Sequence, residues 1–197
     1  MKSNKFYYFF ATFIIIFSGF CCKQNKTNIQ SKDIFLGDSM LSNNIYFKTI
    51  TAEKGFSILE KQNKKYLNEF SYFNKNDIEP TNLNNILFKI IKEKSSNTKQ
   101  VKVNFFIYRN GKKTDSLDFY RNISGDGFGR YICMSYFDQK HHKIWQIKYF
   151  PSIDKEPSNI ISYSESTINS NGKIKLDSLH YIDESLDVEM EKYNLYY

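Results

Sequence analysis

Apolar and polar residues alternate most regularly in the middle of the chain. Apolar side chains occupy every second position from Val101 to Ile107, and the pair Asn110-Gly111 follows. A period of two is typical of a strand with one buried face, and Asn-Gly is a strong hairpin signal. We therefore predict a hairpin whose return strand begins with the segment Leu117–Arg121.

Four further strands are predicted after this hairpin. They cover Tyr131–Phe137, a segment with Trp145, Ile147 and Tyr149 on one face, Ile160–Ile168, and Lys173–Ile182. Residues that favour turns separate these strands, in a glycine-rich link at Gly125–Gly129, a polar turn at Asp138–His142 and a second polar turn at Asn169–Gly172. Short connections of this kind join neighbouring antiparallel strands, so the pattern predicts a meander.

A helical period is found between Thr81 and Lys94. Apolar residues occupy positions i, i+3, i+4, i+7 and i+8 of this segment, namely Leu83, Ile86, Leu87, Ile90 and Ile91. Thr81 can cap the N-terminus, and Lys92 and Lys94 would lie in the last turn, where cations complement the helix dipole. This spacing predicts one helix over 81–94.

The region before that segment fits two patterns. Phe56, Leu59, Tyr66, Leu67 and Phe70 would line one face of a helix, whereas Tyr66, Asn68, Phe70 and Tyr72 also alternate. The polar run Gln62–Lys65 can serve as a turn between two strands. Aromatic and β-branched residues around Ile45–Ile50 and Phe70–Phe73 favour a pleated surface, so we predict strands here.

Together these elements predict an α+β fold, in which a mainly antiparallel meander sheet curves around one helix. A lipocalin-like closed β-barrel is the alternative. The chain has 197 residues, and about 175 remain after an N-terminal targeting segment, which is the length of one domain. We place this single α+β domain at 34–197.

The N-terminus has the order of an export signal. Lys2 and Lys5 precede an apolar run from Phe6 to Phe20, and Cys21 and Cys22 follow directly. The run is at the short limit for crossing a hydrocarbon core of roughly 30 Å, which favours a cleaved signal. We therefore assign 1–22 to a signal peptide and the polar segment 23–33 to a flexible tether.

The segment 1–22 resembles a bacterial lipoprotein precursor. In that family a cysteine preceded by small residues is diacylated on sulfur and becomes the new N-terminus. Gly19 and Cys21 are small residues before Cys22, whereas Phe20 precedes Cys21, so the resemblance implies lipid attachment at Cys22, with Cys21 as the alternative. The chain is rich in Asn, Lys, Ile, Phe, Tyr and Ser, a composition similar to that of many Bacteroidota proteins.

The resemblance implies a location in the cell envelope. The expected place is the outer membrane, on its periplasmic or surface face, with the palmitate-type lipid holding the chain to the membrane. Simple secretion or an uncleaved N-terminal membrane anchor are the alternatives. The formal charge is +7, but the lysines are scattered and the stretch Asp183–Glu191 is acidic, so nucleic acid is not an expected partner.

Few residues offer chemistry. Cys133 is the one cysteine outside the signal region, and it lies in a predicted strand, where a buried, unreactive side chain is expected. Zinc sites usually show a clearer ligand spacing than His141, His142 and His180 do, so no metal site is predicted, although these histidines could supply ligands with Asp138. The loop Ser124–Gly129 lacks the ending of a phosphate-binding loop. We predict no cofactor and no catalytic residue.

The sequence therefore predicts a membrane-anchored envelope lipoprotein with a non-enzymatic binding or interaction module for a protein or small ligand. Two alternatives stay open. One is a small periplasmic hydrolase or metal-dependent enzyme that uses the histidines, and the other is a carrier of an apolar ligand, if the sheet encloses a cavity lined by Phe and Tyr.

Overall fold

The computed structural model describes residues 34–52, 55–73, 75–78, 85–94, 100–125, 129–151, 159–181 and 192. All of them belong to one compact unit, 34–197. The predicted signal peptide with Cys21 and Cys22, the predicted tether 23–33 and the acidic stretch Asp183–Glu191 lie outside the described residues.

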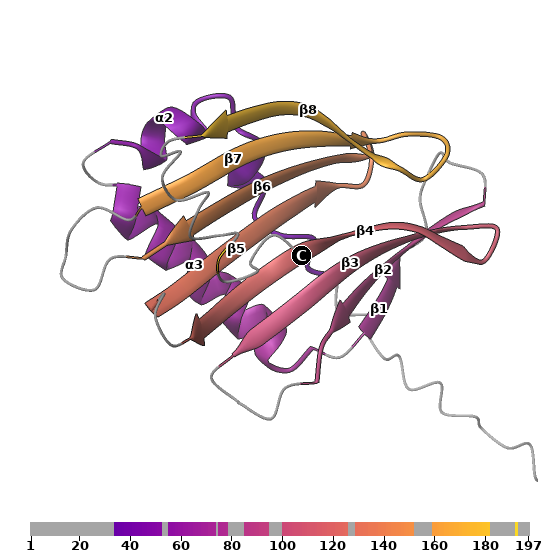
Figure 1. The fold of residues 1–197 in the computed structure, drawn as a ribbon, viewed down its shortest axis with the longest axis horizontal. Helices are drawn as coiled ribbons and strands as arrows, with labels where there is room; N and C mark the ends of the chain where they lie inside the picture. The colour runs from indigo at the N-terminus through magenta and orange to yellow at the C-terminus, as the bar shows by residue number, and fades with distance from the viewer. Residues whose placement is uncertain are drawn as a thin grey trace, which may run out of the picture. The chain divides into compact units, whose positions relative to one another are not determined.

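One antiparallel sheet dominates the described part of the chain (Figure 1). Its strands are β1 (Lys75–Ile78), β2 (Ile86–Lys92), β3 (Val101–Arg109), β4 (Lys112–Gly125), β5 (Gly129–Asp138), β6 (Lys143–Phe150), β7 (Asn159–Ile168) and β8 (Ile174–Tyr181). Each strand pairs with the next one in sequence, so the predicted meander is confirmed. The hairpin turn is also confirmed, because Asn110 and Gly111 have φ values of 51° and 75°, as a type I′ turn requires. The return strand begins at Lys112, five residues earlier than predicted.

The sheet is not closed into a barrel. In the described residues its order runs from β1 at one edge to β8 at the other, and no register joins these two strands. The lipocalin-like alternative is therefore wrong, and the α+β fold with a curved sheet is confirmed.

The helix that packs on the sheet is not the predicted one. Helix α3 (Gly55–Ser71) lies across one face of the sheet (Figure 1), preceded by the 3₁₀ helix η1 (Ser39–Ser42) and by α2 (Tyr46–Ile50). The strands predicted around Ile45–Ile50 and Phe70–Phe73 are therefore wrong. The helical pattern through Leu59, Tyr66 and Phe70 prevails because all three side chains are buried against the sheet.

The helix predicted over 81–94 is also wrong. Residues 86–92 form β2, which pairs with β3 along its length, while 81–84 lie outside the described residues. Ile86, Phe88 and Ile90 are fully buried, and the residues between them are half-buried. A strand that is apolar on both faces has no clear period of two, and a short apolar run of this kind cannot be told from a helix by periodicity.

Aromatic side chains fill the core between α3 and the sheet. Phe70 stacks on Tyr120 with ring centroids 5.6 Å apart, and Tyr66 lies 5.4 Å from the same ring. On β2 and β3, Phe88 and Phe105 stack at 5.5 Å, and both meet Phe137 at 4.9 Å. The abundance of Phe and Tyr thus serves packing first.

Strands β4 and β5 separate along part of their length. Their pairing starts at Tyr120 and Met134 and ends at Gly125 and Gly129, whereas the first half of β4 pairs with β3 alone. A bulge at Phe119 marks the point of divergence. Beyond it, the backbone N–H of Phe137 on β5 donates to the carbonyl of Leu36 over 2.8 Å. The N-terminal segment of the domain thus takes the place that β4 leaves.

Candidate functional site: a groove on strands β6 to β8

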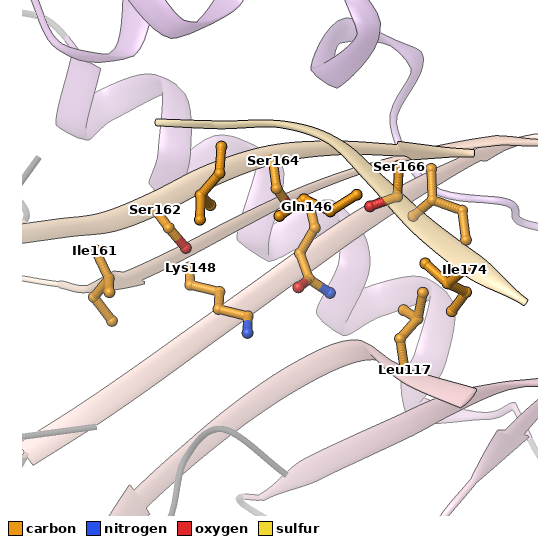
Figure 2. Close-up of a pocket in the computed structure, with 11 residues that line it drawn as sticks. Leu117, Gln146, Lys148, Ile161, Ser162, Ser164, Ser166 and Ile174 are labelled. Atoms are coloured by element: carbon orange, nitrogen blue, oxygen red, sulfur yellow. The ribbon is translucent and has the colours of Figure 1, made fainter. Parts of the chain in front are cut away.

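A groove lies on the face of β6 to β8 that points away from the helices. Tyr149 and Tyr163 define the helix side, since their hydroxyls donate to the carbonyls of Leu59 in α3 and Leu41 in η1. Their neighbours on the strands point the opposite way. The groove has a volume of about 260 Å³ and is lined by Leu117, Ile144, Gln146, Lys148, Ile161, Ser162, Ser164, Ser166, Ile174, Leu176 and Leu179 (Figure 2).

Three serines on β7 form a polar row along the groove. Ser162, Ser164 and Ser166 occupy alternate positions of the strand, so their side chains share one face. Among the described residues, no side-chain hydrogen bond is made by these three hydroxyls. Ser162 and Ser166 are buried, with 8% and 9% of their surface exposed, and Ser164 is half-buried. The row spans about 13 Å, given the rise of a strand, and offers both donors and acceptors to a ligand.

The floor of the groove comes from β6. Gln146 Nε2 donates to the carbonyl of Asp118 over 2.7 Å and to Ser135 Oγ over 2.9 Å, so two neighbouring strands fix this amide. Lys148 lies opposite Ser162 in the register. A bulge at this point leaves Ile161 unpaired, which brings Ile161 and Ser162 to the same pocket.

Strand β8 supplies an apolar wall through a second bulge. Ser164 pairs with Leu179 and Ser166 with Leu176, and the extra residue on β8 between these pairs is Asp177. Without the bulge, residues 176 and 179 would point to opposite faces. With it, both leucines line the groove, and they are 53% and 37% exposed. An exposed pair of leucines beside free hydroxyls makes this surface amphipathic.

The hairpin tips close one end of the groove. Thr114 Oγ1 on β4 donates to the carbonyl of Gly172 over 2.8 Å, and the backbone N–H of Ile174 donates to Asp115 Oδ2 over 3.0 Å. These contacts hold Leu117 near Ile174, as Figure 2 shows. The closed end is therefore apolar.

The opposite end of the groove is mixed, since a lysine and a serine lie there with Ile161. In Figure 2, Lys148 and Ser162 lie at the end away from Leu117 and Ile174, with Gln146 between them. Ile161 lies beyond Ser162 at this end, so each end of the groove carries an aliphatic side chain.

A polar cluster around Arg121 includes Asp118, on which the charge of Lys148 also acts. Arg121 Nη2 donates to Asn104 Oδ1 over 2.7 Å, forms an ion pair with Asp118, and approaches Glu93 at 3.5 Å. Burial raises the pKa of the Asp118 carboxyl, although the charges of Arg121 and Lys148 act in the opposite direction. The charges of Arg121 and Lys148 thus both act on this carboxyl.

Cys133 is fully buried in β5, as predicted for a small packed side chain. Its Sγ lies 3.6 Å from the carbonyl of Asp118. Burial raises the pKa of this thiol to about 12. Since the thiolate is the nucleophilic form, Cys133 is unreactive at neutral pH.

The candidate histidines lie in two separate places. His141 Nδ1 meets Asp138 Oδ2 at 2.7 Å in the turn before β6, a contact that the sequence alone did not indicate. His142 follows with φ +54°, and its Nε2 is buried without a partner beside Phe88. His180 instead lies on β8 and stacks on Phe47 of α2 at 4.9 Å. It pairs with Tyr163 in the middle of β7, whereas the carbonyl of His142 accepts from the N–H of Ile168 at the end of that strand. Among the described residues, no three His, Cys, Asp or Glu side chains gather as a metal site would need.

The groove residues were not singled out from the sequence, although one signal was present. The serines at 162, 164 and 166 repeat with a period of two, which marks one face of a strand. The leucines at 176 and 179 do not show this period, because they share a face only through the bulge at Asp177. In the loop Ser124–Gly129, Ser124 and Gly125 end β4 and Gly129 begins β5, while 126–128 lie outside the described residues.

Within the described ranges, no helix has the length and apolar character needed to cross a membrane. Comparisons of the chain with protein-family models, with curated proteins and with solved structures gave no match.

Proposed function

We propose that this protein is an envelope lipoprotein, anchored through a lipid on Cys22, whose domain is a non-enzymatic binding module. The binding site is the groove on β6 to β8, and its ligand is a small amphipathic molecule. The observation that supports this most directly is the row of serine hydroxyls opposite the exposed Leu176 and Leu179, since these hydroxyls have no side-chain partner within the described part of the chain. A surface with both characters fits a ligand that has both as well.

The anchor and the groove are complementary parts of this proposal. A lipid at Cys22 would keep the domain near the membrane, where amphipathic molecules are concentrated. The segment between Cys22 and the first described residue, Ile34, is polar and suits a tether. The support for the anchor is the sequence of 1–22 alone.

The anchor is tested by feeding cells a radiolabelled fatty acid and recovering the protein. We expect label on the wild type and on Cys21→Ala, and none on Cys22→Ala. Label that disappears only in Cys21→Ala moves the lipid to that residue. Absence of label from the wild type disproves the anchor.

The groove is tested by photolabelling in isolated membranes that contain the full chain. The probe is a neutral alkyl alcohol with a diazirine on its chain, and mass spectrometry locates the adducts. We expect adducts on groove residues, and their loss in Ser164→Phe, which fills the groove. Lys175→Phe is the matched control, since it adds the same ring at an exposed position of β8 whose neighbour Leu176 lines the groove. Adducts spread evenly over the domain, or unchanged in Ser164→Phe, contradict the proposal.

A further inference from the structure

The exposed side of α3 carries lysines and no acid. The exposed residues of this helix recur at the spacing of a single helical face, and they are Ser57, Lys61, Lys64, Lys65, Asn68 and Ser71. We call this stripe the lysine face, and we propose that it docks on the surface of an anionic lipid bilayer. This inference rests on the lipid anchor of the proposed function and is independent of the groove.

The rest of the helical layer has the same charge bias. Within the described ranges 34–52 and 55–73, no acidic side chain is exposed, whereas Lys48 of α2 is exposed in addition to the lysine face. The acids of these ranges are all buried or half-buried, and they are Asp38, Glu60 and Glu69. The outer surface of this layer is therefore positively charged.

The acids of the layer are already engaged. Asp38 Oδ2 meets Lys65 Nζ at 3.6 Å, and Glu60 Oε2 approaches Arg130 Nη1 at 3.8 Å. Within the described part of the chain, no acid pairs with Lys61 or Lys64. These two ammonium groups are thus available to an anionic partner.

Anionic head groups suit this surface. Each lysine near an anionic leaflet strengthens binding about fivefold at low salt, over a distance of about one Debye length. A lysine can also lay its methylene groups along apolar surface while its charge stays at the head groups. The exposed Met40 of η1 and Ile45 before α2 add apolar side chains to the same layer, as interfacial surfaces commonly do.

The chain enters the domain beside the lysine face. Phe35 packs on Tyr66 at 5.1 Å and on Phe70 at 5.4 Å, and Lys65 Nζ lies 5.7 Å from the centroid of the Phe35 ring. Residues 23–33 separate Cys22 from the first described residue. A segment of this length spans at most about 40 Å, so a lipid on Cys22 would keep the start of the domain, and α3 with it, within reach of the bilayer.

The lysines would orient the domain rather than attach it. A few lysines alone give weak and reversible binding, whereas an anchor raises the effective concentration of the bilayer surface. Helix α3 covers one face of the sheet (Figure 1), and the groove lies on the other. Docking through the lysine face therefore leaves the groove uncovered.

Photo-crosslinking to lipid tests the docking. The full chain, purified from membranes, is reconstituted into vesicles of phosphatidylcholine or of equal parts phosphatidylcholine and phosphatidylglycerol. A diazirine amino acid replaces Asn68 on the lysine face or Lys112 at the β3–β4 turn, both of which are exposed. In the anionic vesicles we expect about tenfold more lipid adduct at position 68 than at position 112, and in the neutral vesicles no difference.

Variants with the diazirine at position 68 assign the effect to the lysines. Lys61→Gln combined with Lys64→Gln should lower the adduct yield about fivefold or more, and the two Lys→Arg replacements should retain it. The matched control combines Lys140→Gln with Lys175→Gln, which removes two exposed charges elsewhere and should leave the yield unchanged. Circular dichroism checks that each variant is folded. Equal losses in the two Gln pairs would show that total charge, and not this face, is responsible, and would overturn the proposal.

Flotation of the vesicles separates this inference from the anchor. If the chain floats with both kinds of vesicle but positions 68 and 112 give equal lipid adducts, the docking is wrong and the anchor stands. If it floats with anionic vesicles alone and position 68 is preferred, the docking stands and the anchor is wrong. If it floats with neither, both are wrong. Adducts at position 68 to protein instead of lipid, in isolated native membranes, would replace the bilayer by an acidic protein partner and overturn the proposal.

Discussion

The hydroxyl of Tyr66 in α3 donates a hydrogen bond to the carbonyl of Ser135 on β5 over 2.8 Å. The same oxygen accepts a bond of 2.8 Å from the backbone N–H of Asp38. Tyr66 is fully buried, and it thereby joins the helix, the middle of the sheet and the N-terminal segment of the domain. This contact lies where β4 has left β5, so a side chain stabilises a region in which strand pairing is incomplete.

Replacing Tyr66 by Phe is expected to lower the free energy of unfolding by about 1–3 kcal/mol. The substitution keeps the ring but leaves the Asp38 N–H and the Ser135 carbonyl without their partner, and an unsatisfied buried group carries a cost of this size. Urea unfolding followed by circular dichroism measures the change. Tyr72→Phe is the matched control, because Tyr72 is 95% exposed and should lose almost no stability. Equal effects of the two substitutions would show that the Tyr66 hydroxyl is not structural.

Gly37→Ala is expected to destabilise the domain by about 2–5 kcal/mol, the sum of backbone strain and overpacking. Gly37 has φ +97°, and a Cβ there would lie 2.1 Å from the carbonyl oxygen of Ser135. Gly111→Ala separates the two contributions, since Gly111 has φ +75° but nothing within 4 Å of its Cβ position. That control should cost about 1–2 kcal/mol. A smaller loss at Gly37 than at Gly111, in the same unfolding assay, would contradict the close approach of this segment to β5.

The sequence predicted the sheet from β3 to β8 because each of those strands shows its own local signals. It misplaced the helix because the deciding contacts are distant in sequence. The polar pair Gln62 and Asn63 suggested a turn, yet both side chains are buried in α3. Tyr46 donates to Gln62 Oε1 and Tyr120 donates to Asn63 Oδ1, each over 2.7 Å. No local pattern indicates that a tyrosine of another element will satisfy a buried amide.

The groove was hidden from the sequence for a related reason. Periodicity assigns faces correctly only while a strand stays regular, and four bulges interrupt the strands around the groove. The extra residues decide where β4 diverges and which side chains reach the pocket; they are Thr114, Phe119, Ile161 and Asp177. Bulges depend on pairing between strands, which a single sequence does not display.

Cys133 is expected to react with a thiol reagent only when the domain unfolds. Its burial and the raised pKa of about 12 keep it protonated and inaccessible at neutral pH. The test uses the full chain with Cys21→Ser and Cys22→Ser, so that Cys133 is the one thiol present. Reaction with Ellman's reagent should be slow in buffer and fast in denaturant. The control is a second chain that also carries Cys133→Ala and Tyr72→Cys, and it should react at once in buffer and in denaturant. Rapid reaction of Cys133 in the folded protein would contradict its burial.

His142 is expected to make the domain less stable as the pH falls below 6.5. Burial is the largest influence on its pKa and lowers it, with His141 acting in the same direction and Asp138 against it. The unfolded state then binds a proton more readily than the folded state, so the stabilising difference is present above pH 6.5 and is lost as the pH falls through the pKa of folded His142. His142→Asn should flatten the dependence of the unfolding free energy on pH in this window, and Asn tolerates the φ of +54° at this position. His180→Gln leaves His142 in place and should keep the slope.

The lowered pKa of the Asp138 carboxyl adds a second loss of stability at more acidic pH, below 3.8, which His142→Asn should retain. Urea titrations at a series of pH values resolve the two windows, and a slope that survives in His142→Asn would exclude this histidine as its source.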